Sequence, residues 1–415
     1  MCCEAPLQRY WQRNYENKNA GAAGSRAIIN NCHPFSPIDY CMSIVSIRRI
    51  KKDGILPALE MLLQPFVPHL PLSGKSVLIK PNLVEPEHYT TGQTTNPQLI
   101  EAIIIWCRQQ GASKIAIGEG PSYFQPQSAL RECFTQTGIA DVAKRQNVPW
   151  ILFDEGPFRE FRNHSPRTPK IFYVSEHAFT WEHVINVPVP KSHYLTTVSI
   201  GMKNLKGFLK RCDKPAFHYA GSDGIHGSVT ELNLLIRPAL TIVDCTAPVH
   251  TNKNFLLAGT DIVAVDAVTT SLMGLNPRKI KTIQLGHAAG LGEMNVAKID
   301  IQGDDLKYFK MNFEQPEDYL RRAFTGITLS AQSACSGCLI PLFSALHRIE
   351  QEGNNTDNEI AIFLGKDGLT ETSKRLLFIG QCTKEQAGNN CQLNGCPPTK
   401  EEMFEFLREH LLKPA

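Results

Sequence analysis

Four cysteines near the end of the chain have the spacing of a metal centre. Cys335 and Cys338 are separated by two residues, which lets two thiolates converge on one centre. Cys382 follows an apolar run, and Cys396 stands in a Gly-Cys-Pro-Pro segment whose prolines stiffen the backbone. Since all four are soft thiolate ligands, they suit either an iron–sulfur cluster or a structural zinc ion.

The order of these cysteine motifs resembles that of a known cluster-binding pattern. Cys-x-x-Cys, then Gly-x-Cys, then Gly-Cys-Pro-Pro resembles the cluster-binding pattern in the small subunit of nickel–iron hydrogenases and the related subunit of respiratory complex I. The resemblance implies that Cys335, Cys338, Cys382 and Cys396 hold a 4Fe-4S cluster, with Cys391 left as a spare. It covers the ligand motifs alone and does not imply hydrogenase activity.

A second group of polar residues lies close to the ends of short apolar runs. Lysines with amides and hydroxyls around them can hold a carboxylate or a phosphate. We predict that a small anionic substrate is bound by Lys80, Asn82, Thr94, Thr95, Asn204 and Lys206. We predict Lys191, Lys203 and His193 as catalytic, with His193 as proton donor. His218 and His226 are further histidines of this region, and the alternative for each lysine is a solvated surface charge.

Motifs in this region occur in one order along the chain. They are Lys80-Pro-Asn82, Thr94-Thr-Asn-Pro97, Gly118-Glu-Gly120, Asn186-Val-Pro-Val-Pro-Lys191-Ser-His193, Gly201-Met-Lys-Asn204-Leu-Lys-Gly207 and Gly259-Thr-Asp-Ile-Val-Ala-Val-Asp266. In this order, residues 74–295 resemble the family named domain of unknown function 362. Its members often carry an iron–sulfur module, which agrees with the C-terminal cysteines. The chain departs from many relatives in its extra N-terminal leader and in lacking the eight-cysteine ferredoxin insert.

Short apolar runs alternate with helical segments and must position these residues. We expect strands at 76–80, 114–118, 150–154, 183–188 and 240–244, and helices at 97–110 and 127–137. This alternation predicts an α/β fold, a largely parallel sheet with helices on both faces. Ligands of such sheets bind beyond the carboxyl ends of the strands. A buried helix is expected over 262–268, with one of Asp261 and Asp266 capping its start or pairing with a lysine.

The pattern divides the chain into parts. We predict a flexible leader at 1–41, the α/β domain at 42–295, and a smaller C-terminal α/β iron–sulfur module at 331–415. Between about 292 and 330 the pattern loosens. The module is expected to contain a helix at 339–351, strands at 359–364 and 375–380, and a final helix from Lys400 that Thr399 caps.

Composition bounds the function. With 415 residues the chain can bury two cores, and a formal charge of +3 argues against a dedicated nucleic-acid binder. Apolar runs stay short of the ~18 residues that span a bilayer, and the first residues lack a signal peptide's apolar core. We therefore expect a cytoplasmic protein, whose 13 cysteines stay reduced.

The sequence thus predicts an iron–sulfur oxidoreductase that acts on a small anionic molecule, with a protein as electron donor. Two alternatives stay open: a non-enzymatic electron-transfer or cluster-carrier protein, and an isomerase-type enzyme whose cluster is structural. In either alternative the four cysteines keep their role as ligands.

Overall fold

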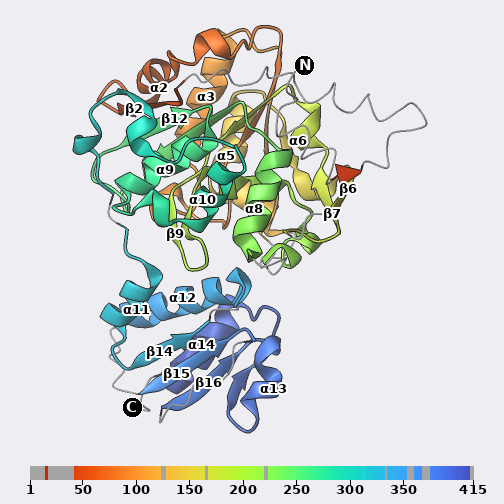
Figure 1. The fold of residues 1–415 in the computed structure, drawn as a ribbon, viewed down its shortest axis with the longest axis vertical. Coiled ribbons are helices and arrows are strands. Elements are labelled where there is room, and N and C mark those ends of the chain that lie inside the picture. The colour runs from red at the N-terminus through yellow and green to blue at the C-terminus, as the bar shows by residue number, and fades with distance from the viewer. Residues whose placement is uncertain are drawn as a thin grey trace. The chain divides into compact units, whose positions relative to one another are not determined.

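The computed structural model describes residues 15–16, 42–122, 128–163, 167–218, 223–311, 313–331, 334–352, 359–366 and 374–411. The chain folds into two compact units (Figure 1). The first unit comprises Met1–Lys191 and Val198–Phe313. The second unit comprises Ser192–Thr197 and Glu314–Ala415. No helix in the described part of the chain is both long enough and apolar enough to cross a membrane.

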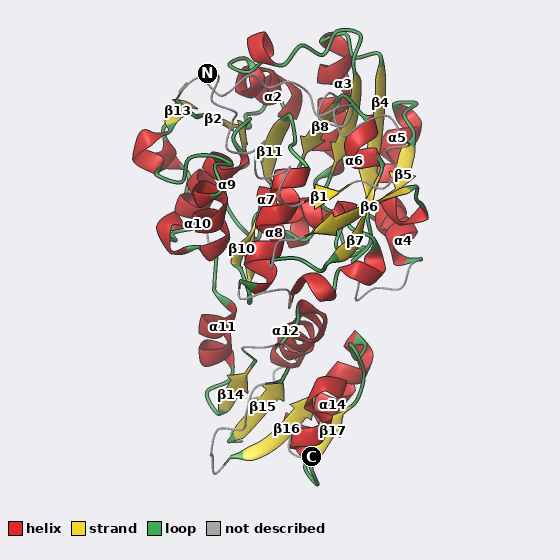
Figure 2. Cartoon of the chain, turned by 45° about the vertical axis from the view of Figure 1, so that its right-hand side comes forward, coloured by secondary structure: helices red, strands yellow, loops and turns green. Residues whose placement is uncertain are grey.

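The first unit is built on an eight-stranded sheet (Figure 2) in the order β13-β2-β12-β11-β8-β3-β4-β5. Its strands are β2 (Ile44–Arg49), β3 (Ser76–Lys80), β4 (Lys114–Glu119), β5 (Trp150–Leu152), β8 (His183–Asn186), β11 (Leu240–Cys245), β12 (Phe255–Gly259) and β13 (Asp300–Gly303). Strand β12 runs antiparallel to both neighbours, and the other pairings are parallel. The predicted α/β fold with a largely parallel sheet is confirmed, and its central strands are apolar because both faces are covered.

Two groups of helices accompany this sheet. The first group is α2 (Ile55–Leu63), α3 (Pro97–Gln109), α4 (Ala129–Gln136) and α5 (Ile139–Arg145), which share one apolar core with the sheet. The second group is α7 (Gly201–Asn204), α8 (Gly224–Leu235), α9 (Ile262–Leu272) and α10 (Lys281–Ala288). The buried helix predicted from 262 is α9, and Asp261 caps it by accepting a hydrogen bond from the Ala264 N–H at 2.9 Å.

Two small sheets in the first part of the chain were not predicted. Strands β6 (Phe158–Asn163) and β7 (Ile171–Ser175) form an antiparallel pair, to which β1 (Tyr15–Glu16) adds a third strand. The other residues of the predicted leader at 1–41 lie outside the described ranges. Strands β9 (Lys191–His193) and β10 (Thr197–Ser199) form a two-stranded sheet.

The second unit contains a four-stranded parallel sheet. Its strands are β14 (Ile327–Ser330), β15 (Ile360–Leu364), β16 (Arg375–Ile379) and β17 (Cys391–Leu393), in that order. The helices are α11 (Pro316–Ala323), α12 (Ser336–Gln351), α13 (Lys384–Ala387) and α14 (Lys400–Leu411), and α12 packs on α14. The predicted smaller α/β fold is confirmed. Thr399 caps α14 as expected, in a capping box in which the Glu402 N–H donates to Thr399 Oγ1 at 3.2 Å.

The segment at 292–330, where the sequence pattern loosens, nevertheless contains two strands. Strands β13 and β14 have four residues each and lie at the edges of their sheets. Several of their side chains are only half-buried. An edge position removes the continuous apolar run that marks a central strand, so the sequence does not reveal them.

Candidate functional site

The first candidate site lies where the strand order of the large sheet reverses. From β3 the chain continues to β4 and β5 on one side, and β8 and β11 follow on the other. Lys80 at the end of β3 is paired with Asn186 at the end of β8. Ligands of open α/β sheets bind at such a switch point, beyond the carboxyl ends of the strands. The predicted residues Lys80 and Asn82 therefore occupy the expected edge.

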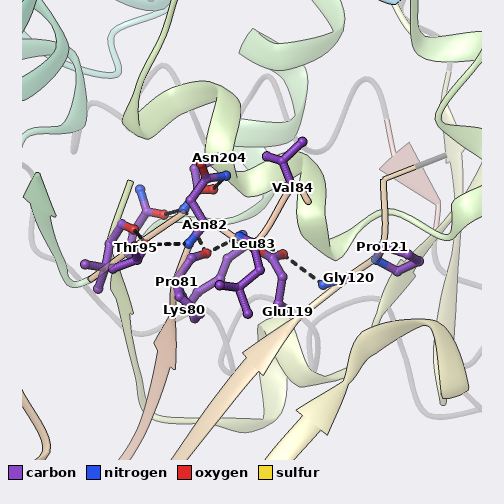
Figure 3. Close-up of polar contacts among 12 residues, drawn as sticks. Lys80, Pro81, Asn82, Leu83, Val84, Thr95, Glu119, Gly120, Pro121 and Asn204 are labelled. Carbon is purple, nitrogen blue, oxygen red and sulfur yellow. Dashed lines mark hydrogen bonds and ion pairs between the residues drawn. The ribbon is translucent and has the colours of Figure 1, made fainter. Parts of the chain in front are cut away.

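Three asparagine side chains connect the loops at this point, and Figure 3 labels two of them, Asn82 and Asn204. Asn82 Nδ2 donates to Asn204 Oδ1 at 2.9 Å, and Asn204 Nδ2 donates to Asn186 Oδ1 at 2.8 Å. Asn186 in turn donates to the carbonyl of Gly201 at 3.1 Å. Asn82 Oδ1 is buried and accepts no hydrogen bond within the described ranges. The network orients the amides and leaves one acceptor for a ligand that donates.

The two predicted threonines are engaged by the backbone. Thr95 Oγ1 accepts from the Asn82 N–H at 2.8 Å and donates to the Val187 carbonyl at 3.0 Å. Thr94 Oγ1 donates to the carbonyl of Glu87 at 2.8 Å. Both side chains are buried. They hold the loop after β3 in place beside the asparagines.

Lys80 lies in a buried ion pair. Its Nζ is 2.8 Å from Glu119 Oε1 at the end of β4, and the two side chains are 0% and 3% exposed. Burial lowers the pKa of Lys80, and Glu119 opposes this shift. Gly207 covers the pair, since a Cβ there would lie 2.0 Å from Glu119 Oε1 and 2.6 Å from Lys80 Nζ. If Lys80 binds an anion, as predicted, it does so while paired with the carboxylate of Glu119.

Three other predicted lysines lie in the first unit. Lys191 Nζ donates to the Gln93 carbonyl at 2.6 Å, and burial together with the charge of Lys203 lowers its pKa to about 7. Burial lowers the pKa of Lys203 to about 8. Lys206 Nζ lies 3.4 Å from Nε2 of His218. Because these amines influence one another's charge, an anion that binds among them would be stabilised.

The histidine beside this lysine group is His218. Its Nδ1 lies 2.9 Å from the carbonyl of Lys214, and burial with the charges of Lys206 and Lys203 holds its pKa well below the ordinary value. His193 belongs to residues 192–197, which group with the second unit, and its Nδ1 accepts from the N–H groups of Leu195 and Thr196. Its predicted catalytic partnership with Lys191 stays a prediction.

A buried carboxylate, Asp266, positions the turn that carries Lys203. Asp266 accepts from the N–H groups of Gly201 and Met202, at 2.8 and 3.0 Å, at the start of α7. Burial raises the pKa of Asp266 to about 7 despite these donors. Asp266 thereby anchors the turn that carries Lys203 and Asn204. The sequence feature that could have indicated this role is the position of Asp266 at the end of the Gly259–Asp266 motif.

The second candidate site is formed by cysteines of the second unit. Cys335 precedes α12 as its N-cap residue and Cys338 lies in the first turn, while Cys382 and Cys396 follow the carboxyl ends of β16 and β17. Cys338 and Cys335 are hydrogen-bonded through their side chains. That bond, burial and the charges of Cys335, Cys382 and Cys396 raise the pKa of the Cys338 thiol. The four predicted ligands are therefore close enough to interact.

One glycine, Gly380, leaves room among these thiols. A Cβ at Gly380 would lie 3.2 Å from Cys338 Sγ and 3.5 Å from Cys382 Sγ. Gly380 and Gly395 have φ angles of 94° and 137°, which favour glycine. Cys391 lies at the start of β17, where its Sγ is 3.8 Å from Arg375 Nη2. Its position at the other end of that strand separates it from Cys396.

Across the described ranges, no three His, Cys, Asp or Glu side chains are arranged to hold one metal ion. Other cysteines are core residues: Cys107, Cys133 and Cys245 are buried, and burial raises the pKa of each thiol.

Comparison with known proteins assigns a domain to the first site. The chain contains a domain of unknown function 362, matched at residues 77–271. This DUF362 domain extends from β3 into α9, so it includes the asparagine network and the lysine group, and it confirms the resemblance inferred from the motifs.

Two further proteins are similar. Thylakoid-associated protein sll1697 of Synechocystis sp. is a distant homologue, 26% identical over 267 residues, which cover 60% of this chain and 79% of that protein. The lactate racemase apoprotein of Thermoanaerobacterium thermosaccharolyticum aligns with 79% of this chain and 70% of its own, at 13% identity and a TM-score of 0.38.

Proposed function

We propose that this protein is an iron–sulfur oxidoreductase. Cys335, Cys338, Cys382 and Cys396 would hold a 4Fe-4S cluster, and the lysines of the DUF362 domain would bind a small anionic substrate. The observation that carries the proposal is the gathering of these four interacting thiols beyond the strand ends of one parallel sheet.

The residues around the thiols fit a negatively charged cluster. Cys335 is the N-cap of α12, a 16-residue helix, and the positive end of a helix dipole stabilises thiolates. The backbone N–H of Gly365, just after β15, donates to the Cys382 sulfur. Such hydrogen bonds stabilise negative charge and tune the potential of a bound cluster. When bound, the cluster would supply one-electron chemistry.

Zinc is the alternative occupant of these four thiols. A structural zinc ion needs its thiolates about 2.3 Å from one point. A cluster accepts each thiolate at a different iron atom, so its ligands need not meet at one point. Metal analysis therefore separates the two.

The lysine group supports an anionic substrate. Lys191, Lys203 and Lys206 carry amines that are close enough to shift one another or a shared histidine. Bringing cations together in a partly buried place costs free energy, which a bound carboxylate or phosphate offsets. We extend the proposal to a protein electron donor, because Cys382 and Cys396 are exposed. Thiol ligands also point to a reducing compartment such as the cytoplasm.

Anaerobic purification followed by iron, sulfide and zinc analysis tests the cluster. We expect about four iron and four sulfide per chain, with broad visible absorbance that dithionite bleaches. Cys335→Ser and Cys396→Ser should each lower the iron content, whereas Cys391→Ser is the matched control and should keep it. Zinc without iron, or equal iron in all variants, would refute the cluster.

The redox role needs a second measurement. In an oxidoreductase, Cys335→Ser should abolish electron transfer to the substrate while anion binding survives. A protein that only carries electrons or clusters should exchange with its partner equally well after Lys191→Ala. An isomerase with a structural cluster should lose stability and activity together when the cluster is lost, with no potential dependence.

A further inference from the structure

We propose that Lys203 is a nucleophilic amine that forms an imine with the carbonyl carbon of a small 2-oxo acid. The inference rests on the proposed function in one respect, since the carboxylate of the oxo acid is the anion that the lysine group would bind. It adds a covalent step that the iron–sulfur proposal neither contains nor requires.

Lys203 differs from three other lysines of the first unit that are partly or wholly buried. Lys80 is paired with Glu119, Lys191 donates to the Gln93 carbonyl, and Lys214 donates to the carbonyl of Pro121. For Lys203 the described residues provide no hydrogen-bond acceptor and no carboxylate partner, although its side chain is half-buried. Its amine is therefore available to a ligand.

Burial favours the neutral amine of Lys203. Lys191 and His218 are affected by its charge, Lys206 lies beside His218, and Asp266 binds the backbone at the start of the same turn. Burial lowers the pKa of Lys203 to about 8, against about 10.4 for an ordinary lysine. At pH 8 the neutral, nucleophilic fraction is about a hundredfold larger than that of an ordinary lysine.

The backbone around Lys203 is held on both sides. Gly201 and Met202 donate to Asp266, and the side chain of Asn204 is bound to Asn82 and Asn186. Met202 is fully buried. Lys203 thus projects from an anchored turn near the switch point, where a substrate is expected.

The proposed step balances without an oxidant or reductant. The Lys203 nitrogen forms a bond to the carbonyl carbon, and the carbonyl oxygen takes up a proton to give a carbinolamine. Loss of that oxygen as water leaves the imine, so one amine and one oxo acid yield one imine and one water. Lys206 would hold the carboxylate during the step.

Borohydride trapping on the full-length, cluster-loaded protein tests the inference. Pyruvate, glyoxylate or 2-oxoglutarate is added separately at pH 8, then sodium borohydride, and the lysines are mapped by peptide mass spectrometry. We expect a reduced adduct, heavier by one oxo acid minus one oxygen atom, on Lys203. Its labelling should exceed that of an ordinary surface amine by about a hundredfold.

Two variants and one binding measurement separate the outcomes. Lys203→Arg keeps a positive charge and should lose the adduct, whereas Lys310→Arg, at an exposed position, should keep it. If calorimetry shows that an oxo acid binds but none of the three leaves an adduct on Lys203, the imine is refuted and the anion site stands. If none of the three binds or reacts, the imine and the anion site both fail. Adducts spread evenly over exposed lysines would also overturn the inference.

Discussion

The buried Lys80–Glu119 pair makes a stability prediction that can be worked from the structure. Glu119→Gln removes the carboxylate and leaves Lys80 with no countercharge at 2.8 Å, in a place where its side chain is 0% exposed. Breaking a buried ion pair on one side costs about 3–5 kcal/mol, because the remaining charge is desolvated and unpaired. The melting temperature of the first unit should then fall by about 5–10 °C.

The loss should also depend on pH. Burial lowers the pKa of Lys80 in the folded protein, and removing Glu119 lowers it further. The unfolded chain then binds more protons than the folded one between the folded pKa and the ordinary lysine value. Stability of the variant should therefore rise as pH increases through this interval, more steeply than that of the wild type.

Urea unfolding followed by tryptophan fluorescence measures the effect. Trp106, Trp150 and Trp181 all belong to the first unit. Glu155→Gln is a matched control, since its 2.7 Å ion pair with Arg131 is 57–60% exposed and should contribute less than about 1 kcal/mol.

A double substitution distinguishes the lost pair from general damage. Lys80→Met combined with Glu119→Leu removes both charges and should recover most of the stability that Glu119→Gln loses. If Glu119→Gln costs no more than Glu155→Gln, the reasoning from burial is wrong.

Two further predictions concern the same site. Gly207→Ala should destabilise the first unit by about 1–3 kcal/mol, because its Cβ would overlap Glu119 and Lys80. Gly274→Ala is the control: its Cβ meets open space, and the φ angle of 81° should cost about 1 kcal/mol. Equal losses in urea unfolding would contradict the overlap. For Asp266, a folded pKa of about 7 above an ordinary value of 3.8 means that the folded state holds its proton longer. Its contribution to stability should fall as pH rises from about 4 to 7, and Asp266→Asn should flatten that part of the profile; an unchanged profile would show that Asp266 does not titrate there.

The features predicted best from the sequence are those that depend on residues close by in the chain. Strand β3 has the predicted bounds, and Thr399 caps α14 through a residue three positions away. Strands β13 and β14 escaped prediction because edge strands bury too little to show a pattern. The contact between His218 and Lys206 could not be predicted either, since it depends on the folding of separate turns.

The alternation that makes a parallel sheet, the polar residues at strand ends and four cysteines of suitable type and spacing can all be recognised in the amino-acid sequence. Which of these side chains already have partners depends on the folded structure. Lys80 is paired with Glu119, while Lys203 has no partner within the described ranges. The two lysines look alike in sequence. Burial and partners at long sequence distance separate them, because the free energy of a charge depends on what surrounds it in space.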